Sequence, residues 1–427
     1  MWIIHIPDAK IDKKGRVVLP LVVILSKKSK IFQFVREYVQ QYIIFIFNYL
    51  GGRKMKDAKV YAYYFPNWHQ DARNDVWHGK GWTEWEVVKC ARPRFEGHKQ
   101  PNVPLWGYED EADPKVMAKK IRVAKEYGID GFIFDTYYYD DGPYRERCLD
   151  EGFLKAENNE EMEFSVMWCN HDAIYAHPSP RLIVSPTLKS AVVDEEAFVR
   201  ITDDFIRKYF TKKNYMRIDG KIFFIIYNVG KLIKELGGEE EAARIFNDFR
   251  QRVRDAGLGE MHLGCVPDII EDLLDNPKEL NRILKVLGID EGIRYWWPVK
   301  YQDNRLTVEY KDFADVGIKT FDADLQFYDI PVAPVVMSGL DQSPRTIQSE
   351  IYENINLYPW YAIVDHCNVA DYERVLRETL KFIRSDRFKG HFAGLIWNEW
   401  TEGNFLEPSV ENGYKYLEAV KRVKSEV

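Results

Sequence analysis

From residue 59 onward, short apolar runs alternate with longer segments in which apolar residues recur at helical spacing. Apolar runs of about four to eight residues are typical of strands buried on both faces, and strands that alternate with helices favour a parallel sheet. We therefore predict an α/β fold, a (β/α)₈ barrel, with a doubly wound open sheet as the alternative. The predicted strands are 60–65, 131–138, 163–169, 222–227, 262–266, 293–299, 332–338 and 392–397.

Amphipathic segments between these runs predict the helices of the barrel. Asp113-Pro114 predicts a helix start, because Asp caps free N–H groups and Pro fits the first turn, and Gly128 predicts the end of that helix. No internal repeat, low-complexity tract or interdomain linker interrupts residues 55–427, so we expect one catalytic domain there. The predicted helices are 114–127, 144–156, 195–209, 239–256, 277–287, a weaker one at 308–325, 371–385 and 412–424.

Residues 1–54 do not follow the pattern of the rest of the chain. Their two apolar runs, 17–25 and 42–50, are shorter than the roughly 20 residues that a membrane-spanning helix needs. No small-residue cleavage site follows the first run, so a signal peptide is not expected. We do not expect a membrane partner, and a peripheral membrane helix around residues 31–50 is the alternative. We predict that the biological start is Met55 and that residues 1–54 are an upstream extension.

Composition excludes several classes of function. The net charge is −7 without a basic excess, which argues against nucleic-acid binding. The five cysteines are scattered without CxxC spacing, which argues against a zinc site and suggests a reducing, cytoplasmic compartment. Neither a GxGxxG motif nor a P-loop is present, so we predict no cofactor. The oligomeric state is left open.

Two weak metal patterns are interpreted as structural. His171, Asp172 and His177 are metal-ligating residue types, but no ligand spacing supports a site, and we predict no metal. Asp322-Ala-Asp324 matches the loose pattern with which metal-dependent glycosyltransferases bind nucleotide sugars. Such a short pattern is common by chance, and we expect a solvated helix end there.

Polar and aromatic residues follow nearly every predicted strand. In a (β/α)₈ barrel the carboxyl ends of the strands meet at one face, which is where active sites lie. With 12 Trp, 26 Tyr and 24 Phe in the chain, many of them beside polar residues, this face suits a cleft that stacks on sugars. We therefore expect an oligosaccharide or polysaccharide substrate. The predicted substrate contacts here are Tyr63, Trp68, His69, Asp135, Tyr137, Trp168, Asn170, Tyr227, Trp296, Asn398 and Trp400.

The loop after the first strand is unusually rich in indoles. Residues 77–85 hold three tryptophans, one glutamate and a glycine turn. We predict a carbohydrate platform in which Trp82 and Trp85 stack on sugar faces and Glu84 bonds hydroxyls. The alternative is a rigid structural plug over the barrel mouth.

The last predicted strand runs into two carboxylates three residues apart, Glu399 and Glu402. Ionised groups beside a core must be paired or hydrogen-bonded, so their presence there is costly. Glycoside cleavage needs one carboxylic acid to protonate the leaving oxygen and one carboxylate on the other side. Trp397 and Trp400 could raise the pKa of one glutamate by desolvation. We predict that Glu399 and Glu402 are catalytic, the alternative being a helix cap or a salt-bridged pair.

Five segments together resemble the WbsX-like proteins, a group related to the family 99 glycoside hydrolases, the endo-α-mannosidases. The resemblance runs from about residue 60 to 423. The segments are Tyr61-Ala-Tyr-Tyr-Phe-Pro-Asn-Trp-His69, Gly79-Lys-Gly-Trp-Thr-Glu-Trp85, Phe95-Glu-Gly-His-Lys-Gln-Pro101, Lys125-Glu-Tyr-Gly-Ile-Asp-Gly131 and Trp397-Asn-Glu-Trp-Thr-Glu-Gly403.

The resemblance implies a (β/α)₈ barrel and metal-independent, retaining hydrolysis of α-mannosidic bonds. By position, Glu399 would be the general base and Glu402 the general acid. The base would deprotonate the sugar 2-hydroxyl, which then attacks the anomeric carbon to give a 1,2-anhydro sugar.

Two departures from the family pattern bear on the substrate. The third strand ends Trp168-Cys-Asn-His-Asp172, and the second carries Phe134-Asp-Thr-Tyr137, where relatives have other residues. WbsX-like proteins are also described as glycosyltransferases of cell-surface polysaccharide synthesis. A transferase of the O-antigen type and a non-catalytic carbohydrate-binding barrel are therefore the alternatives to a hydrolase.

Overall fold

The computed structural model describes residues 10–11, 17–18, 58–182, 184–270, 275–298 and 303–427. The chain forms two compact units, Met1–Lys56 and Asp57–Val427, each described by itself. In the first unit, β1 (Lys10–Ile11) pairs antiparallel with β2 (Val17–Val18). The predicted start at Met55 and the rest of the predicted extension lie outside the described residues.

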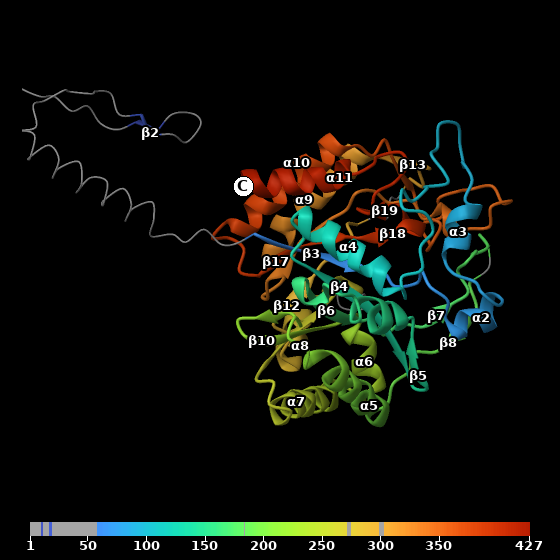
Figure 1. Ribbon diagram of the computed structural model, residues 1–427. Helices are drawn as coiled ribbons and strands as arrows, with labels where there is room; N and C mark the ends of the chain where they lie inside the picture. Colours follow the sequence, from blue (N-terminus) through green and yellow to red (C-terminus); the bar gives the residue numbers. More distant parts are fainter. Residues whose placement is uncertain (1–9, 12–16, 19–57, 183, 271–274, 299–302) are drawn as a thin grey trace, which may run out of the picture. The chain divides into compact units, whose positions relative to one another are not determined.

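The second unit is a nearly closed barrel of parallel strands, which confirms the predicted (β/α)₈ fold (Figure 1). The seventh strand is split at Pro334 into β14 and β15: β14 pairs with β12 and β15 pairs with β17. Since β14 and β15 are the two ends of the sheet and follow each other directly in the chain, the barrel is nearly closed. The barrel strands are β3 (Lys59–Tyr64), β4 (Gly131–Tyr139), β6 (Glu163–Trp168), β10 (Lys221–Ile226), β11 (Met261–Cys265), β12 (Glu291–Ile293), β14 (Val332–Ala333), β15 (Val335–Val336) and β17 (Phe392–Ile396).

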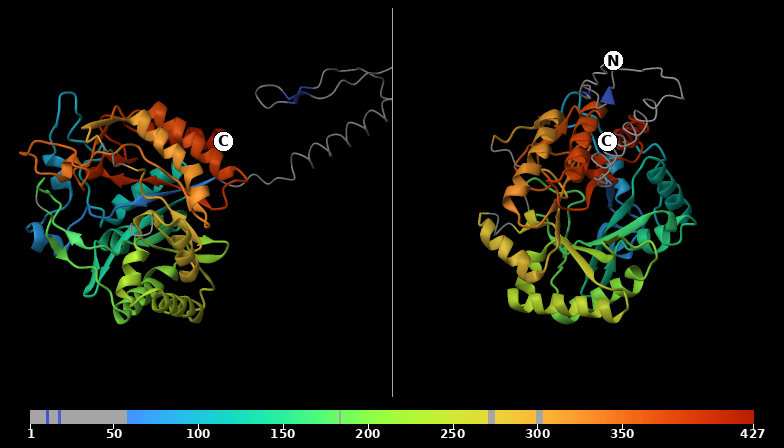
Figure 2. Two further views of the ribbon diagram at one scale, coloured as in Figure 1. Left: turned by 180° about the vertical axis from the view of Figure 1, so that it is seen from behind. Right: turned by 90° about the vertical axis from the view of Figure 1, so that its left-hand side faces the viewer.

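Helices surround the strands, as the two further views show (Figure 2). Asp113 caps α4 as predicted, by accepting a hydrogen bond from the Lys115 N–H, and Gly288 ends α8 in a left-handed conformation. The helices are α2 (Ala72–His78), α3 (Trp85–Cys90), α4 (Pro114–Glu126), α5 (Glu195–Phe205), α6 (Val229–Glu235), α7 (Glu239–Asp255), α8 (Pro277–Leu287), α9 (Tyr310–Phe327), α10 (Val369–Arg384) and α11 (Lys415–Glu426).

Short strands in the loops complete the second unit. The hairpin of β18 and β19 directly follows the last barrel strand. These strands are β5 (Gly142–Tyr144), β7 (Ala173–Ile174), β8 (Thr187–Lys189), β9 (Arg217–Ile218), β13 (Thr307–Glu309), β16 (Ile363–Asp365), β18 (Asn398–Glu399) and β19 (Asn404–Phe405).

Two predicted elements differ from the structure. The helix predicted at 144–156 is reduced to a π-helical segment, Cys148–Phe153, because Tyr144 instead ends β5 and Arg145 has a φ of 64° that no helix accepts. The sixth strand ends at Ile293, not at residue 299. After it the chain turns to bury Trp297, whose indole N–H donates to the Val335 carbonyl at 2.9 Å.

Large aromatic side chains fill the barrel where its strands begin. The ring of Phe392 packs edge-on against Tyr61 at 5.3 Å and against Phe223 at 5.7 Å. Beside them the buried Glu291 accepts hydrogen bonds from His391 at 2.7 Å and from His262 at 3.2 Å. This end is therefore closed by side chains, and the functional site has to be sought at the other end.

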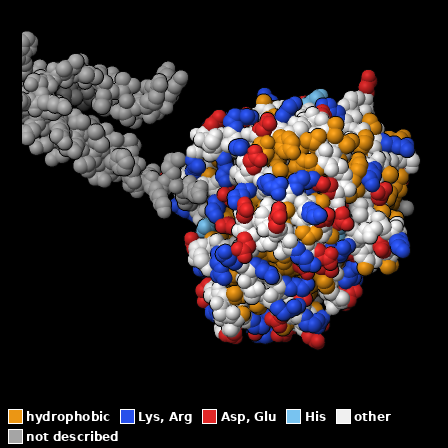
Figure 3. All heavy atoms as spheres, in the orientation of Figure 1, with side chains coloured by type: hydrophobic (Ala, Val, Ile, Leu, Met, Phe, Trp, Pro, Cys, Tyr) orange, Lys and Arg blue, Asp and Glu red, His pale blue; other side chains and the backbone are white. Residues whose placement is uncertain are grey.

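Charged side chains of both signs are spread over the visible face of the second unit (Figure 3). On the face shown in Figure 3, Lys and Arg are interspersed with Asp and Glu without a basic patch. Within the described ranges, every helix is too short or too polar to cross a bilayer.

Candidate active site

A cavity of about 820 Å³ opens where the barrel strands end. Side chains from the ends of β4, β6, β10, β12, β15 and β17 and from the loops that follow them line it. A cavity of this size holds a small oligosaccharide, since ligand pockets are about 300–1,000 Å³. The convergence predicted from the polar residues after each strand therefore produces one pocket.

A tight hairpin presents Glu399 and Glu402 to this cavity. Glu399 ends β18, Glu402 ends a single 3₁₀ turn, and Gly403 reverses the chain with a φ of 64°. A Cβ on Gly403 would meet the Asp341 backbone nitrogen at 2.9 Å, so this turn requires glycine. Asn398 fixes the start of the hairpin by accepting a hydrogen bond from the Phe65 N–H at 2.8 Å.

Arg345 forms ion pairs with both glutamates. Its Nη2 donates to Glu399 at 3.1 Å, and its Nη1 contacts Glu402. Arg345 is only 5% exposed, so its charge acts on the glutamates with little screening by water. One cation thus holds both carboxylates in place.

The two glutamates have different surroundings. Burial raises the pKa of Glu399 well above its usual value, and the charge of Glu402 raises it further. Glu402 is partly exposed to the cavity, with 15% of its side-chain surface accessible. Two carboxyl groups that lie side by side in different surroundings suit the roles of an acid and a base in one reaction.

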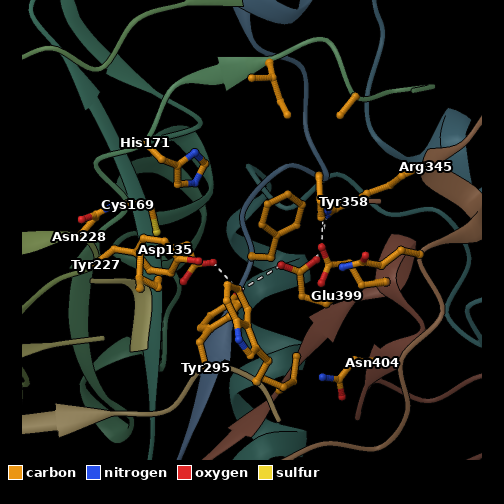
Figure 4. A pocket seen from close by; sticks show the side chains of 18 of the residues that line it. Asp135, Cys169, His171, Tyr227, Asn228, Tyr295, Arg345, Tyr358, Glu399 and Asn404 are labelled. Atoms are coloured by element: carbon orange, nitrogen blue, oxygen red, sulfur yellow. Dashed lines mark hydrogen bonds and ion pairs between the residues drawn. The ribbon is translucent and has the colours of Figure 1, made fainter. Parts of the chain in front are cut away.

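A third carboxyl group, Asp135, joins the pair through Tyr295 (Figure 4). The Tyr295 hydroxyl lies 2.8 Å from Asp135 Oδ2 and 3.1 Å from Glu399 Oε1. A hydroxyl has one proton, so both contacts are hydrogen bonds only when one carboxyl group is protonated. Burial raises the pKa of Asp135 to about 8, which supplies that proton at neutral pH.

Of the Asp322-Ala-Asp324 pattern, Ala323 and Asp324 line the cavity and Asp322 does not, so the two carboxylates diverge. Asp324 is buried and receives two hydrogen bonds from Arg294, at 2.7 and 2.5 Å. Asp322 is exposed and pairs with Arg387. The expectation of a solvated helix end holds for Asp322 but not for Asp324. Because the two carboxylates point to different partners, they do not fit a shared metal and nucleotide site.

Six of the predicted site residues line the cavity. Trp296, 36% exposed, offers an indole at the rim, and its ring contacts Tyr227 edge-on at 6.4 Å. Indoles placed in this way can stack on sugar C–H faces. The six are Asp135, Tyr137, Tyr227, Trp296, Glu399 and Glu402.

Two of the three indoles in the loop at 77–85, Trp82 and Trp85, pack against protein side chains, whereas Trp77 lines the cavity. Trp68 stacks on Trp85 at 4.1 Å, and Trp85 packs against Trp400 at 6.0 Å. The Trp400 N–H donates to the buried Glu407 at 2.8 Å. Trp82 stacks on His78 at 4.2 Å, behind the cavity lining. The alternative of a structural plug, which the sequence left open for this loop, therefore describes Trp82 and Trp85, and the predicted contacts Trp68 and Trp400 are buried beside them.

Other predicted contacts are structural because their polar atoms face the protein. The Tyr63 hydroxyl donates to the Arg294 carbonyl at 3.1 Å. Trp168 is buried against Phe198 of α5. His69 lies in the interior, where burial lowers its pKa to about 3.

Asn170 and Asn398 are likewise used by the backbone. Asn170 accepts from the Asn228 N–H and donates to the Asn228 carbonyl, both at 2.8 Å. The Asn398 amide also donates to the Phe65 carbonyl at 2.9 Å. Both asparagines are fully buried and do not line the cavity.

Glu84 supports the site from behind. It pairs with Arg345 at 3.2 Å and with His177 at 3.3 Å, and it accepts a hydrogen bond from Thr401 at 2.5 Å. Burial alone would raise the pKa of Glu84, but His177 and Arg345 hold it well below its usual value. Glu84 therefore positions Arg345. The prediction that Glu84 bonds sugar hydroxyls does not fit this buried position.

Since His177 is engaged by Glu84, the weak metal pattern of His171, Asp172 and His177 does not form a ligand cluster. His171 bonds instead to the Asp172 carbonyl at 3.0 Å.

Sequence reasoning missed Arg345, Tyr295 and Tyr358. Tyr295 follows the sixth strand beside Trp296, so the pattern of polar residues after strands could have indicated it. Arg345 and Tyr358 come from the long loop between β15 and β16, and both contact the same site. Nothing periodic in that loop marks them.

The barrel has the fold of solved glycoside hydrolases. Among solved structures, the GH99 endo-alpha-mannosidase from Bacteroides thetaiotaomicron has a TM-score of 0.51 at 13% identity, over 87% of this chain and 98% of that one. A glycoside hydrolase-like protein has a TM-score of 0.54 at 17% identity, over 86% and 94%. At these identities the likeness concerns the fold.

The chain belongs to the family described as glycosyltransferase WbsX, whose model matches residues 60–420. It is also similar to the uncharacterized protein WxcX of Xanthomonas campestris pv. campestris, in strains B100 and ATCC 33913. Each is 26% identical over 377 residues, which is 86% of this chain and 49% of the relative. The chain thus spans about half the length of the curated relatives it matches.

Proposed function

We propose that this protein is a glycoside hydrolase that cleaves α-mannoside-like linkages in a polysaccharide or glycan. The observation that carries the proposal is the pair Glu399 and Glu402, held by Arg345 in a cavity of oligosaccharide size. Aromatic side chains and polar groups share the wall, as a sugar with apolar and hydroxyl faces requires.

We assign the general base to Glu399 and the general acid to Glu402, as the family resemblance implies. A raised pKa makes the Glu399 carboxylate a stronger base, better matched to removing a proton near neutral pH. Glu399 takes the proton of the 2-hydroxyl, and that oxygen forms a bond to C1. The C1–O bond to the leaving sugar breaks as Glu402 protonates its oxygen. Water then opens the 1,2-anhydro sugar with the proton transfers reversed, which retains the configuration.

The experiment follows the anomer of the product by NMR during cleavage of a panel of α-mannosides and bacterial polysaccharide fragments. A retaining route gives the α-anomer first, and a 2-deoxy analogue of a cleaved substrate should be inert because it lacks the attacking oxygen. A β-anomer as the first product, or rapid cleavage of the 2-deoxy analogue, would contradict the mechanism.

Glycosyl transfer from a nucleotide sugar is the second candidate, and the family description is what favours it. The diverging carboxylates of Asp322 and Asp324 argue against a metal-held diphosphate. Thermal unfolding with GDP or UDP and Mn²⁺ separates the two candidates, since a bound ligand raises the apparent stability. The hydrolase proposal predicts no shift in the midpoint of unfolding.

We also propose a cellular location, a domain boundary and a partner for the protein. We place it in the cytoplasm, with residues 55–427 as the catalytic domain and a glycan as its partner. The free state of all five cysteines supports a reducing compartment.

A further inference from the structure

The cavity is lined by three arginines, and one of them differs from the others in what it contacts. Arg294 pairs with Asp324 and Asp268, and Arg345 pairs with three glutamates. Among the described residues, no carboxylate forms an ion pair with the Arg145 guanidinium within 4.0 Å, although Arg145 is only 8% exposed. Glu84 attracts the guanidinium from a longer distance but is itself paired with Arg345 and His177. A buried charge without a directly paired counterion is costly, so a ligand that supplies one would stabilise it.

The surroundings of Arg145 are neutral and aromatic. Its guanidinium carbon lies 4.4 Å from the ring centre of Tyr144, 4.7 Å from Tyr137 and 4.9 Å from Phe65. The Tyr144 oxygen shares a hydrogen bond with it, and the buried Nε has no partner. Rings stabilise a cation through their π electrons but leave its N–H donors largely unused. Donors therefore remain for a ligand in the cavity.

The backbone at this position is unusual for an arginine. Arg145 has a φ of 64°, in the left-handed region that non-glycine residues rarely adopt. Its N–H donates to Asp71 at 3.0 Å, which holds the residue in this conformation at the cavity wall. Strained conformations persist where the surrounding structure enforces them, often at ligand sites.

From this geometry we propose that Arg145 binds a carboxylate carried by the substrate, so that the glycan contains a uronic acid. The inference rests on the proposed function and names its substrate class. An arginine fork matches a carboxylate through two parallel N–H···O hydrogen bonds, and in a buried site such a pair is strong and selective. Asp135, whose pKa Arg145 lowers against the effect of burial, lines the same cavity, so the acidic sugar lies near the reacting centre.

The test is an equilibrium binding measurement, which does not depend on catalysis. Calorimetry at pH 7 compares methyl α-D-mannopyranosiduronic acid with methyl α-D-mannopyranoside on the full chain. We expect the acid to bind at least about tenfold more tightly, the scale of one charge-assisted hydrogen-bonded pair. Equal binding of the two sugars, including no measurable binding of either, would overturn the proposal. If the protein prefers the acid but hydrolyses no substrate, only the proposed function would be overturned.

Variants test whether Arg145 is the residue that gives the preference for the acidic sugar. Arg145→Met keeps the apolar stem and removes the charge, and it should abolish the preference for the acid, while Arg145→Lys should keep part of it. Arg147→Met is the matched control, because Arg147 lies two residues away, pairs with Glu151 and does not line the cavity. Preference lost in Arg147→Met, or kept in a folded Arg145→Met, would contradict the assignment. The wild-type comparison decides alone if Arg145→Met does not fold.

Discussion

At the scale of single residues, the site is a set of carboxyl groups that are held by ion pairs and hydrogen bonds from a few partners. Arg345 neutralises Glu399 and Glu402, and Tyr295 bridges Glu399 to Asp135. The carboxyl groups also limit how many of them can be ionised at once, because like charges in a buried site raise each other's pKa. The pH dependence of the reaction should therefore report on these contacts.

Asp135→Asn should change the alkaline side of the pH profile. Burial raises the pKa of Asp135 to about 8, so the group is neutral below that pH and ionises above it. Ionisation places a negative charge beside Glu399 and removes the proton that lets Tyr295 bond to both groups. We expect the kcat/KM of the wild type to fall as the pH rises through about 8, and the variant to lack this fall. An unchanged alkaline limb in the variant would show that another group is responsible.

Glu84→Gln should weaken catalysis without direct contact to substrate. The substitution removes the charge that pairs with Arg345 and His177 but keeps the shape. We expect a fall in kcat of about tenfold with little change in KM, and a loss of about 1–3 kcal/mol in the free energy of unfolding. Steady-state kinetics and urea unfolding measure both quantities. Glu86→Gln is the control, since Glu86 lies on the surface and pairs with Lys89. A raised KM with kcat unchanged would mean that Glu84 binds substrate.

At the scale of elements, the two ends of the barrel differ: one end holds the cavity, and the other is closed by packed side chains. The ends of the strands and the loops after them carry the cavity, whereas the starts of β11, β12 and β17 meet in the group of His262, Glu291 and His391. Burial alone would raise the pKa of Glu291, but hydrogen bonds from both histidines lower it. The hydrogen bond to Glu291 raises the pKa of His391.

The stability of this strand junction should depend on pH. Glu291 contributes stability above its unfolded pKa of 4.5, and this is lost as the pH falls through its lowered folded value. His391 contributes stability below its unfolded pKa of 6.5, and this is lost as the pH rises through its raised folded value. Glu291→Gln should therefore lower the unfolding temperature most between pH 4.5 and 6.5.

Thermal unfolding of Glu291→Gln across the pH range tests this junction, with Glu260→Gln as the surface control, since Glu260 pairs with Arg254 in the open. A destabilisation that is the same at every pH would show that the pair contributes only packing.

At the scale of the whole molecule, the sequence predicts the barrel well, because apolar runs and amphipathic helices alternate through the second unit. It predicts helix 144–156 poorly, because periodicity does not reveal that Arg145 takes a left-handed backbone. The position of Glu399 and Glu402 in the cavity wall could be predicted because charged residues directly after a buried strand are rare enough to be informative.

The rest of the site could not be read in the same way. An indole after a strand looks the same in sequence whether it faces a cavity or a core. Trp296 lines the cavity, while Trp168 and Trp400 are buried with partners elsewhere in the chain. Arg345 reaches the glutamates from a long loop without a regular pattern, so only the folded chain reveals its role.

Removal of residues 1–54 tests the proposed domain boundary. The barrel strands of the second unit pair with one another, so a chain that starts at Met55 should keep the unfolding temperature and the activity of the full chain. Calorimetry and the glycosidase assay measure both. A lower unfolding temperature would show that the barrel depends on the preceding residues. Mass spectrometry of the native N-terminus tests the predicted start, which peptides from before Met55 would contradict.

The most direct test of the central claim is the hydrolysis of an α-mannoside substrate by the wild type, Glu399→Gln and Glu402→Gln. Glu411→Gln serves as the control, because Glu411 lies outside the cavity and pairs with Lys99. Each active-site variant keeps the side-chain shape but cannot transfer a proton, which contributes about 10²–10⁴-fold to the rate. We predict that both lose activity on this scale while staying folded and that the control keeps it. Full activity in either active-site variant would show that the pair is structural.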